Sequence, residues 1–185
     1  MAIMRSRFSV SMLGASLLLL QLLLGSTCIT SEHEKKQRTV DMSDMPWGPT
    51  VDGWRLSVSL DKTQFFQGTR IVATIVFQNL ATQPRSIGGH GVDFDYELDC
   101  RNQQETRIPF TLFGKRMLEN RGEGKATGGV LEPGDRIVAE IILSRHLDLT
   151  LPGRYAITVS RKAIAGAPDH ETVVTSNTFS FEIVD

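Results

Sequence analysis

The chain has 185 residues but only two cysteines, Cys28 and Cys100. Two cysteines are too few to build a scaffold from disulfides, so a hydrophobic core has to stabilise the fold. Neither sign of charge is in clear excess, because the chain has 20 Lys and Arg residues and 21 Asp and Glu residues. No overall field is present to attract nucleic acid or an anionic lipid surface, and we predict no nucleic-acid partner.

Motifs for catalysis and metal binding are also missing. The sequence contains no G-x-S-x-G elbow, and its glycine-rich stretch GEGKATGG lacks the spacing of a phosphate-binding loop. The histidines do not follow HxH or HxxxH spacing; they are His33, His90, His146 and His170. We therefore predict a protein that is not an enzyme, with no cofactor and no zinc site.

Long hydrophobic runs are absent except near the N-terminus. Met1–Arg7 is basic, Phe8–Leu24 is mostly apolar, and the small residues of 25–27 follow. This order is typical of a secretory signal. The alternative is an uncleaved membrane anchor, but the apolar run is interrupted by serines and is shorter than the roughly 20 residues of a spanning helix. The expected location is therefore secreted, periplasmic or in the cell envelope.

Cys28 follows this segment at the place where a bacterial lipoprotein carries its lipidated cysteine. The preceding triplet, Gly-Ser-Thr, departs from the Leu-Ala-Gly pattern, so lipidation is the lesser of two possibilities. If Cys28 is removed or lipidated, Cys100 is the only free thiol; if it is retained, a disulfide between the two is possible. Contact with a membrane is expected only through the signal or a lipid anchor.

The rest of the chain predicts strands. We expect a signal over residues 1–28, a polar linker over 29–52 and one folded domain over 53–185. Apolar and polar residues alternate in several segments of this domain, as in strands buried on one face. Seven strands are expected: Trp54–Leu60, Arg70–Leu80, Val92–Arg101, Ile108–Phe113, Arg136–Leu143, a strand that contains Tyr155 and ends at Arg161, and Ser176–Val184. No segment predicts a convincing amphipathic helix, and the charged, glycine-rich stretch Lys115–Gly129 predicts a mobile loop.

The segment Leu149–Val159, LTLPGRYAITV, indicates the fold class. Tyr155 follows a Pro-Gly turn at the start of the sixth expected strand, where immunoglobulin-like sandwiches have a tyrosine corner. In that corner the hydroxyl donates to backbone a few residues upstream. The alternative is an ordinary tyrosine at the edge of the core. The fold class expected is all-β, a single antiparallel seven-stranded immunoglobulin-like sandwich.

Several segments also carry a family resemblance. They are residues 62–68 followed by RIVATIVFQN, then LEPGDRIVAEI, LPGRYAITV and SNTFSFEIV. Together they resemble the Ig-like domains of secreted bacterial proteins and, more distantly, are similar to BsuPI-like proteinase-inhibitor domains. The resemblance implies a β-sandwich outside the cytoplasm. It transfers no functional residue, because its motifs are turn and core positions.

The expected third strand carries the most suggestive polar cluster. Asp93, Asp95, Glu97 and Asp99 alternate and would share one face. Alternate residues of a strand lie about 6.5–7 Å apart, too far to share one ion at Ca²⁺–oxygen distances. A solvated face, paired with Arg101 or Arg107, is therefore favoured over a metal site, for which the four acids are weak candidates.

These observations predict a non-catalytic binding or structural module of the cell envelope, with a protein or envelope component as partner. The expected contact surfaces are the loop Lys115–Gly129, the turn Gly88–Gly91 and a sheet edge at Ile108–Phe113. Two alternatives stay open: a proteinase-inhibitor-like domain that acts through a surface loop, and a metal-dependent binder that uses residues 93–99.

Overall fold

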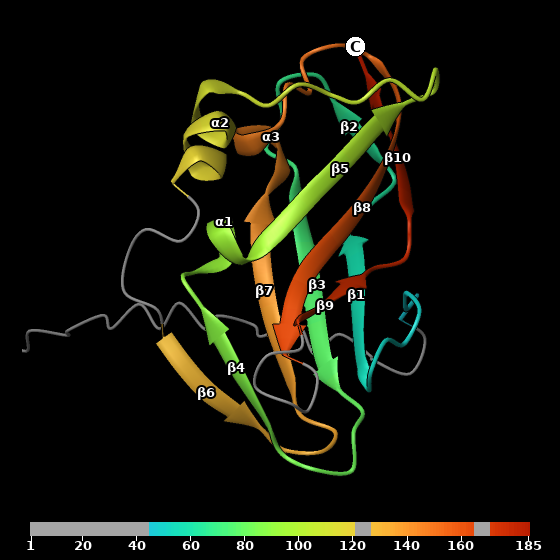
Figure 1. Cartoon of the computed structure of the whole chain (residues 1–185). Helices are drawn as coiled ribbons and strands as arrows, with labels where there is room; N and C mark the ends of the chain where they lie inside the picture. Colours follow the sequence, from blue (N-terminus) through green and yellow to red (C-terminus); the bar gives the residue numbers. More distant parts are fainter. Residues whose placement is uncertain (1–44, 121–126, 165–170) are drawn as a thin grey trace, which may run out of the picture. The chain divides into compact units, whose positions relative to one another are not determined.

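A computed structural model of the chain describes residues 45–120, 127–164 and 171–185. The expected signal sequence, Cys28, His33, His170 and most of the expected linker lie outside these residues. The described part is mostly β, with ten strands and three short helices (Figure 1). Alternation of apolar and polar residues therefore indicated the structural class well.

Two sheets enclose the core. Sheet A has the order β1-β3-β7, all antiparallel, with bounds Trp54–Leu60, Val72–Asn79 and Arg136–Ile142. Sheet B has the order β2-β10-β8-β5, with bounds Gln64–Phe66, Phe179–Val184, Gly153–Ile164 and Tyr96–Asn102, and β9 (Glu171–Thr175) also pairs with β8. The inward residues of both sheets form one hydrophobic cluster, which includes Trp54 stacked on Phe77 at 4.7 Å.

A third, two-stranded sheet stands beside them. Sheet C consists of β4 (Arg85–Gly89) and β6 (Thr127–Leu131), which pair only with each other among the described strands. The helices α1 (Val92–Asp95), α2 (Leu112–Glu119) and α3 (Leu143–His146) are short. In Figure 1, β4 and β6 run apart from the other strands near the lower part of β7.

The count of seven antiparallel strands is wrong. The additional strands β2, β4, β6 and β9 have three to five residues each, too short to show a clear alternation. β2 also runs parallel to β10, with Phe65 opposite Ile183. The strand of Tyr155 is accordingly the eighth of ten described, and it extends three residues past Arg161 to Ile164.

Three expected segments take a different structure. Val92–Asp95 is a helical turn, and the strand begins only at Tyr96 because Gly91, with φ 118°, redirects the chain. Ile108–Phe113 is not a strand; it makes only isolated bridge contacts around Pro109, which has no N–H to donate. The expected loop Lys115–Gly129 begins inside the helix Leu112–Glu119, which is capped by Thr111, and ends in β6, which begins at Thr127. Residues 121–126 lie outside the described part.

The packed part of the chain includes residues before Gly53. Met45 is buried, and the N–H of Gly48 donates to Leu56 at 2.9 Å. The guanidinium of Arg55 lies 3.8 Å from the centre of the Trp47 ring. A Cβ on Gly48 would lie 2.2 Å from the carbonyl oxygen of Thr175, so this segment lies directly on the chain after β9.

The tyrosine corner is present. The Tyr155 hydroxyl donates to the carbonyl of Leu151 at 2.5 Å, four residues upstream, and the side chain is buried. Burial raises the pKa of Tyr155, with smaller contributions from Cys100 and Asp148, so the hydroxyl keeps its proton. The prediction for Tyr155 is confirmed.

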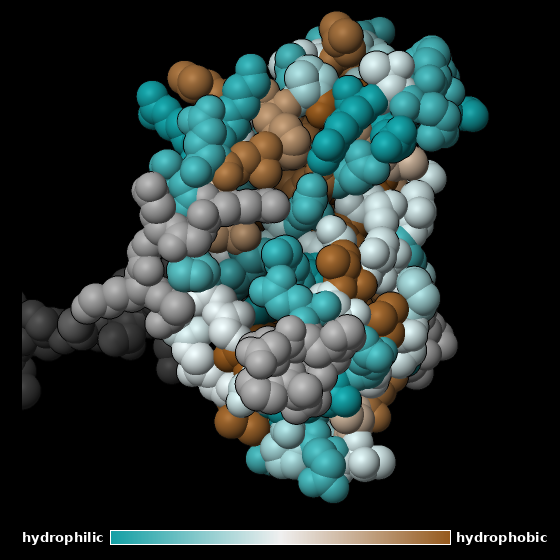
Figure 2. Space-filling view, in the orientation of Figure 1, coloured by the Kyte–Doolittle hydropathy of each residue, from teal (hydrophilic) through white to brown (hydrophobic). Residues whose placement is uncertain are grey.

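In the described part of the chain, no helix has both the length and the apolar character needed to cross a membrane. Figure 2 shows a largely hydrophilic face on which hydrophobic patches are small and separate. Scattered exposed apolar residues are normal on a folded domain, so this face gives no reason to place a large apolar interface on it.

Candidate functional site: a hollow beside a buried arginine

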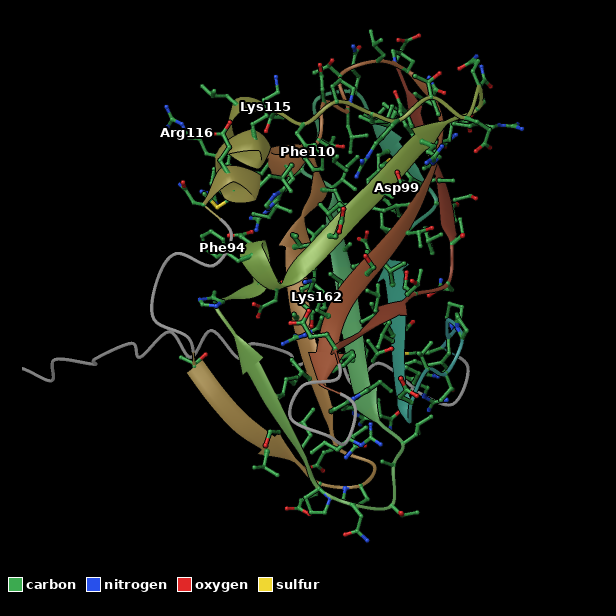
Figure 3. All side chains as sticks on the ribbon, viewed as in Figure 1. Phe94, Asp99, Phe110, Lys115, Arg116 and Lys162 are labelled. Atoms are coloured by element: carbon green, nitrogen blue, oxygen red, sulfur yellow. The ribbon has the colours of Figure 1, made fainter. Side chains whose placement is uncertain are left out.

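The four acids of the expected metal cluster do not share a face. Asp93 and Asp95 lie in the turn α1, whereas Glu97 and Asp99 lie on the outer face of β5. Asp99 is labelled in Figure 3. Asp99 pairs with Arg101 at 3.1 Å and with Arg107 at 3.4 Å. Asp99 therefore has both arginines as partners, although Arg101 lies on its own strand and not on a neighbouring one, and Glu97 lies 3.9 Å from Arg107.

Asp93 has a different partner, the buried His146. The Oδ1 atom of Asp93 lies 2.8 Å from Nε2 of His146, which comes from α3. The Phe113 ring of α2 packs edge-on against the same imidazole at 5.0 Å. This pair joins the three short helices. Among the described residues, no group of three His, Cys, Asp or Glu side chains is placed to hold a metal ion.

Cys100 is buried in the core, as expected from its place in an alternating strand. Its thiol forms no disulfide within the described residues, and the side chain is completely buried. Burial, with a further contribution from Asp99, raises the pKa of Cys100 to about 12. The thiolate, the reactive form, is thus strongly disfavoured at neutral pH.

A hollow of about 350 Å³ lies between sheet C and the sandwich. Its walls are mostly apolar side chains and glycine backbone: Ile87, Gly88, Gly89, Val92, Gly128, Gly129, Ile137 and Ala139. The polar Thr127 also lines it, and its hydroxyl donates to the carbonyl of Gly89 at 3.2 Å. Ile137 and Ala139 are inward residues of β7, yet they are only half-buried because the hollow lies in front of them. The volume is within the usual range of small-molecule sites.

The polar end of the hollow is formed by Arg161, Asp95 and Tyr96. Arg161 lies on the inner face of β8 and is only 6% exposed. Its Nη1 donates to the Tyr96 hydroxyl at 3.0 Å, and its Nη2 donates to the carbonyl of Gly88 at 2.9 Å. The guanidinium carbon lies 5.1 Å from the centres of both the Phe77 and Tyr96 rings, where cation–π attraction helps to offset burial.

Asp95 balances the charge of Arg161. Its Oδ2 lies 3.7 Å from Nη2 of Arg161, and its Oδ1 accepts a hydrogen bond from the backbone N–H of His90 at 2.7 Å. Gly89 allows this arrangement, because a Cβ there would lie 2.3 Å from Oδ2 of Asp95. Burial raises the pKa of Tyr96 despite the opposing effect of Arg161, so the phenol stays neutral.

A second hollow of about 550 Å³ adjoins the first. The two share Ile87, Gly88, Gly89, Asp95 and Arg161. The second is more polar; Phe94 from α1 and Lys162 from β8, both labelled in Figure 3, border it. His90 borders it as well, and its Nδ1 atom is buried without a hydrogen-bond partner among the described residues.

The three surfaces expected to make contacts have separate outcomes. The Gly88–Gly91 segment does border both hollows in part, through Gly88 and Gly89. The segment 108–113 runs into α2 at Leu112; Ile108 is buried and Leu112 is exposed. On α2, Lys115 and Arg116 are exposed and point away from the body of the domain (Figure 3).

Sequence reasoning missed Arg161, although a signal was present. Tyr155, Ile157 and Val159 alternate inward, and the next position of that series is Arg161. A charged residue on the inner face of a strand is unusual and has to be paired or functional. Asp95 could not be assigned as its partner, because the turn at α1 is not visible in the alternation.

No protein-family model matches the chain, and no curated protein matches it significantly. Among solved structures it is similar to the C-terminal domain of wzt, with 11% identity and a TM-score of 0.46 over 76% of this chain and 82% of that one. A β-glucosidase from Listeria innocua in complex with isofagomine matches with 10% identity and a TM-score of 0.39, over 70% of this chain and 16% of the enzyme. The CARDB domain of a Pyrococcus furiosus protein, in complex with di-metal ions, matches with 13% identity and a TM-score of 0.36, over 74% of this chain and 94% of that one. Similarity at this level does not indicate what this chain binds.

Proposed function

We propose that this chain is an exported, non-catalytic binding module of the cell envelope, built on an immunoglobulin-like β-sandwich, and that it binds a small ligand in the hollow beside Arg161. The observation that carries the proposal is the buried guanidinium at the end of an apolar-walled hollow. Burying an arginine is costly unless its hydrogen bonds are satisfied. Among the described residues, two of its five N–H groups have an acceptor.

Export is supported by the basic, apolar and small-residue segments of residues 1–28. The immunoglobulin-like assignment is supported by the Tyr155 hydroxyl bond to Leu151 and by the core shared between sheets A and B. A module of this kind carries recognition on the segments at its margins. The hollow lies at such a margin, between sheet C and the inner face of β7.

Binding without turnover is supported by the chemistry of the groups at the hollow. The two charged side chains there, Asp95 and Arg161, already pair with each other. The Tyr96 phenol is held neutral by burial. These groups are suited to holding a ligand by hydrogen bonds and lack an activated nucleophile.

Two neighbouring residues of β6 provide a matched test. Gly129 lies opposite Ile87 and shares its face of sheet C, which points toward the core; Val130 lies opposite Ser86 on the other face. The burial of Leu131 and the 60% exposure of Val130 agree with these directions. A Cβ on Gly129 would have no protein atom closer than 4.0 Å. We therefore expect Gly129→Val to fill the hollow and Val130→Leu, which adds bulk on the outer face, to leave it open, with both variants folded.

The experiment is native mass spectrometry of the exported protein purified from its own host. We expect a small molecule bound to the parent and to Val130→Leu, and its loss from Gly129→Val. Equal retention by all three proteins would place binding elsewhere. Absence of any adduct from the parent, or conversion of the bound molecule on incubation, would contradict a non-catalytic binding module.

A further inference from the structure

The charge balance of the hollow selects the kind of ligand. The buried positive charge of Arg161 is matched by Asp95, whose side chain is only 15% exposed, at 3.7 Å. An anion bound here would add an unmatched negative charge next to Asp95 in a poorly solvated place. A cation would add an unmatched positive charge next to Arg161. A ligand without net charge leaves the pair as it is.

Arg161 and Asp95 have hydrogen-bonding capacity left over, and a ligand group that both donates and accepts would use it. Among the described residues, Arg161 uses two of five N–H groups, on Tyr96 and Gly88. Within the same part of the chain, the carboxylate of Asp95 accepts one hydrogen bond, from His90, and its Oδ2 is beyond hydrogen-bond distance from Arg161. Donors and acceptors are thus offered side by side. A hydroxyl group can accept from Arg161 and donate to Asp95, and two adjacent hydroxyls can satisfy both.

The remaining walls fit a compact ring with apolar faces. Ile87, Val92, Ile137 and Ala139 offer C–H surface, and the glycines Gly88, Gly128 and Gly129 offer backbone without side chains. The hollow of about 350 Å³ has room for one small ring, and the adjoining hollow of about 550 Å³ begins at the same ion pair. A ligand of several linked units could therefore extend from one into the other.

We propose that the hollow binds a neutral polyhydroxylated ligand, a saccharide unit, whose adjacent hydroxyls are held by Arg161 and Asp95. This inference rests on the proposed binding function and adds the ligand class to it. The ion pair sets the class, the apolar walls hold the C–H faces of the ring, and Gly129 leaves the space that the ring occupies.

The experiment is isothermal titration and saturation-transfer NMR on the full-length chain with defined probes. The neutral probes are the methyl glycosides of glucose, galactose and mannose, and two- and three-unit oligomers of these sugars. The anionic probes are butyrate and glucuronate, the second being a sugar ring that carries a carboxylate. We expect a neutral probe to bind, with an affinity that changes little with salt because no net charge is recognised.

Three variants locate the binding. Gly129→Val should abolish binding and Val130→Leu should preserve it. Arg161→Lys keeps the charge but loses the planar fork, and should weaken binding by about tenfold or more, the effect of losing a hydrogen bond to a charged group. Thermal unfolding of each variant shows whether it is folded, and the Gly129→Val and Val130→Leu pair still tests the site if Arg161→Lys does not fold.

The outcomes separate the two proposals. Tighter binding of butyrate or glucuronate than of the neutral sugars, lost in Gly129→Val, would overturn the ligand class and keep the binding function. Binding of a neutral sugar that survives in Gly129→Val would overturn the site. Failure of every probe to bind would overturn the saccharide assignment, and the mass spectrometry of the host-derived protein would then decide the binding function separately.

Discussion

Tyr155 is the residue at which sequence and structure agree best, and its hydroxyl makes a testable contribution. The bond to the carbonyl of Leu151 is 2.5 Å long and the ring stacks on Phe181 at 5.5 Å. Tyr155→Phe keeps the stacked ring and removes the hydrogen bond. We expect the free energy of unfolding to fall by about 0.5–1.5 kcal/mol, measured by urea denaturation. A variant as stable as the parent would show that the corner contributes nothing to this fold.

Because of Cys100, we expect the free energy of unfolding to fall as the pH becomes alkaline. Its pKa is about 12 in the fold, raised from 9.0 chiefly by burial. The folded state therefore keeps a proton that the unfolded chain loses above about pH 9. The stabilisation is complete below that pH and declines as the pH rises toward the folded pKa. Urea unfolding between about pH 8 and pH 10.5 should show a smaller loss of stability in Cys100→Ala than in the parent.

Tyr96 and Tyr155 also have raised pKa values, and both remain in Cys100→Ala. Because Cys100 contributes to the raised pKa of Tyr155, the comparison reports the thiol together with its effect on that tyrosine. The same burial predicts slow alkylation. Iodoacetamide, followed by peptide mapping, should leave Cys100 unmodified in the folded protein and modify it in urea. Labelling of Cys100 at neutral pH without denaturant would contradict the buried thiol.

At the scale of elements, helix α2 packs closely on α3 through Gly114. A Cβ on Gly114 would lie 2.2 Å from the carbonyl oxygen of His146 and 3.0 Å from its carbon. Gly→Ala inside a helix ordinarily stabilises it, by roughly 0.5–1 kcal/mol. Here we expect the opposite sign, a loss of about 1–3 kcal/mol, because the backbone of α3 has to move.

Lys115→Ala, one residue further along the same helix, is the control for Gly114→Ala. Lys115 is exposed, so its removal should change the free energy of unfolding by less than about 0.5 kcal/mol. Urea denaturation of both variants tests the contact. Increased stability of Gly114→Ala would mean that α2 and α3 do not pack in this way.

The elements also show what sequence patterns can and cannot predict. The strand Trp54–Leu60 is predicted with its observed bounds, because its alternation is long and complete. The alternation of Val92–Arg101 is equally regular, but its first half is the turn α1. There Asp93 contacts His146, which is 53 residues away in sequence, and Asp95 accepts a hydrogen bond from the backbone of His90 across the turn. Periodicity reports which face is buried and cannot report such contacts.

The candidate site illustrates the same limit. Arg161 could be identified as an inward charge by extending the alternation of Tyr155, Ile157 and Val159. The hollow itself could not be predicted, because it depends on sheet C, whose strands β4 and β6 are far apart in sequence and pair only in the folded chain. The glycines that keep it open are indistinguishable in sequence from glycines of a flexible loop.

At the scale of the whole molecule, the proposed role of the folded domain in the cell envelope requires that the chain be exported. The structure describes residues from 45 onward, so the prediction for the preceding segment depends on sequence alone. A basic start, the apolar run Phe8–Leu24 and the small residues after it predict removal of a signal near Cys28. A binding module whose ligand belongs to the envelope requires this transfer, because the hollow would otherwise not meet its ligand.

The intact mass of the chain, isolated from the envelope fraction of its host, tests this prediction. We expect a mass that lacks the residues up to about the cleavage site, with no lipid on the new N-terminus. A further mass equal to a diacylglyceryl group at Cys28 would show the lipidated alternative and place the hollow at a membrane surface. A mass that retains Met1–Leu24, in the membrane fraction, would show an uncleaved anchor. The full-length mass in the cytoplasmic fraction would contradict export, and with it the assignment to the envelope, while the saccharide titrations would remain a valid test of the hollow.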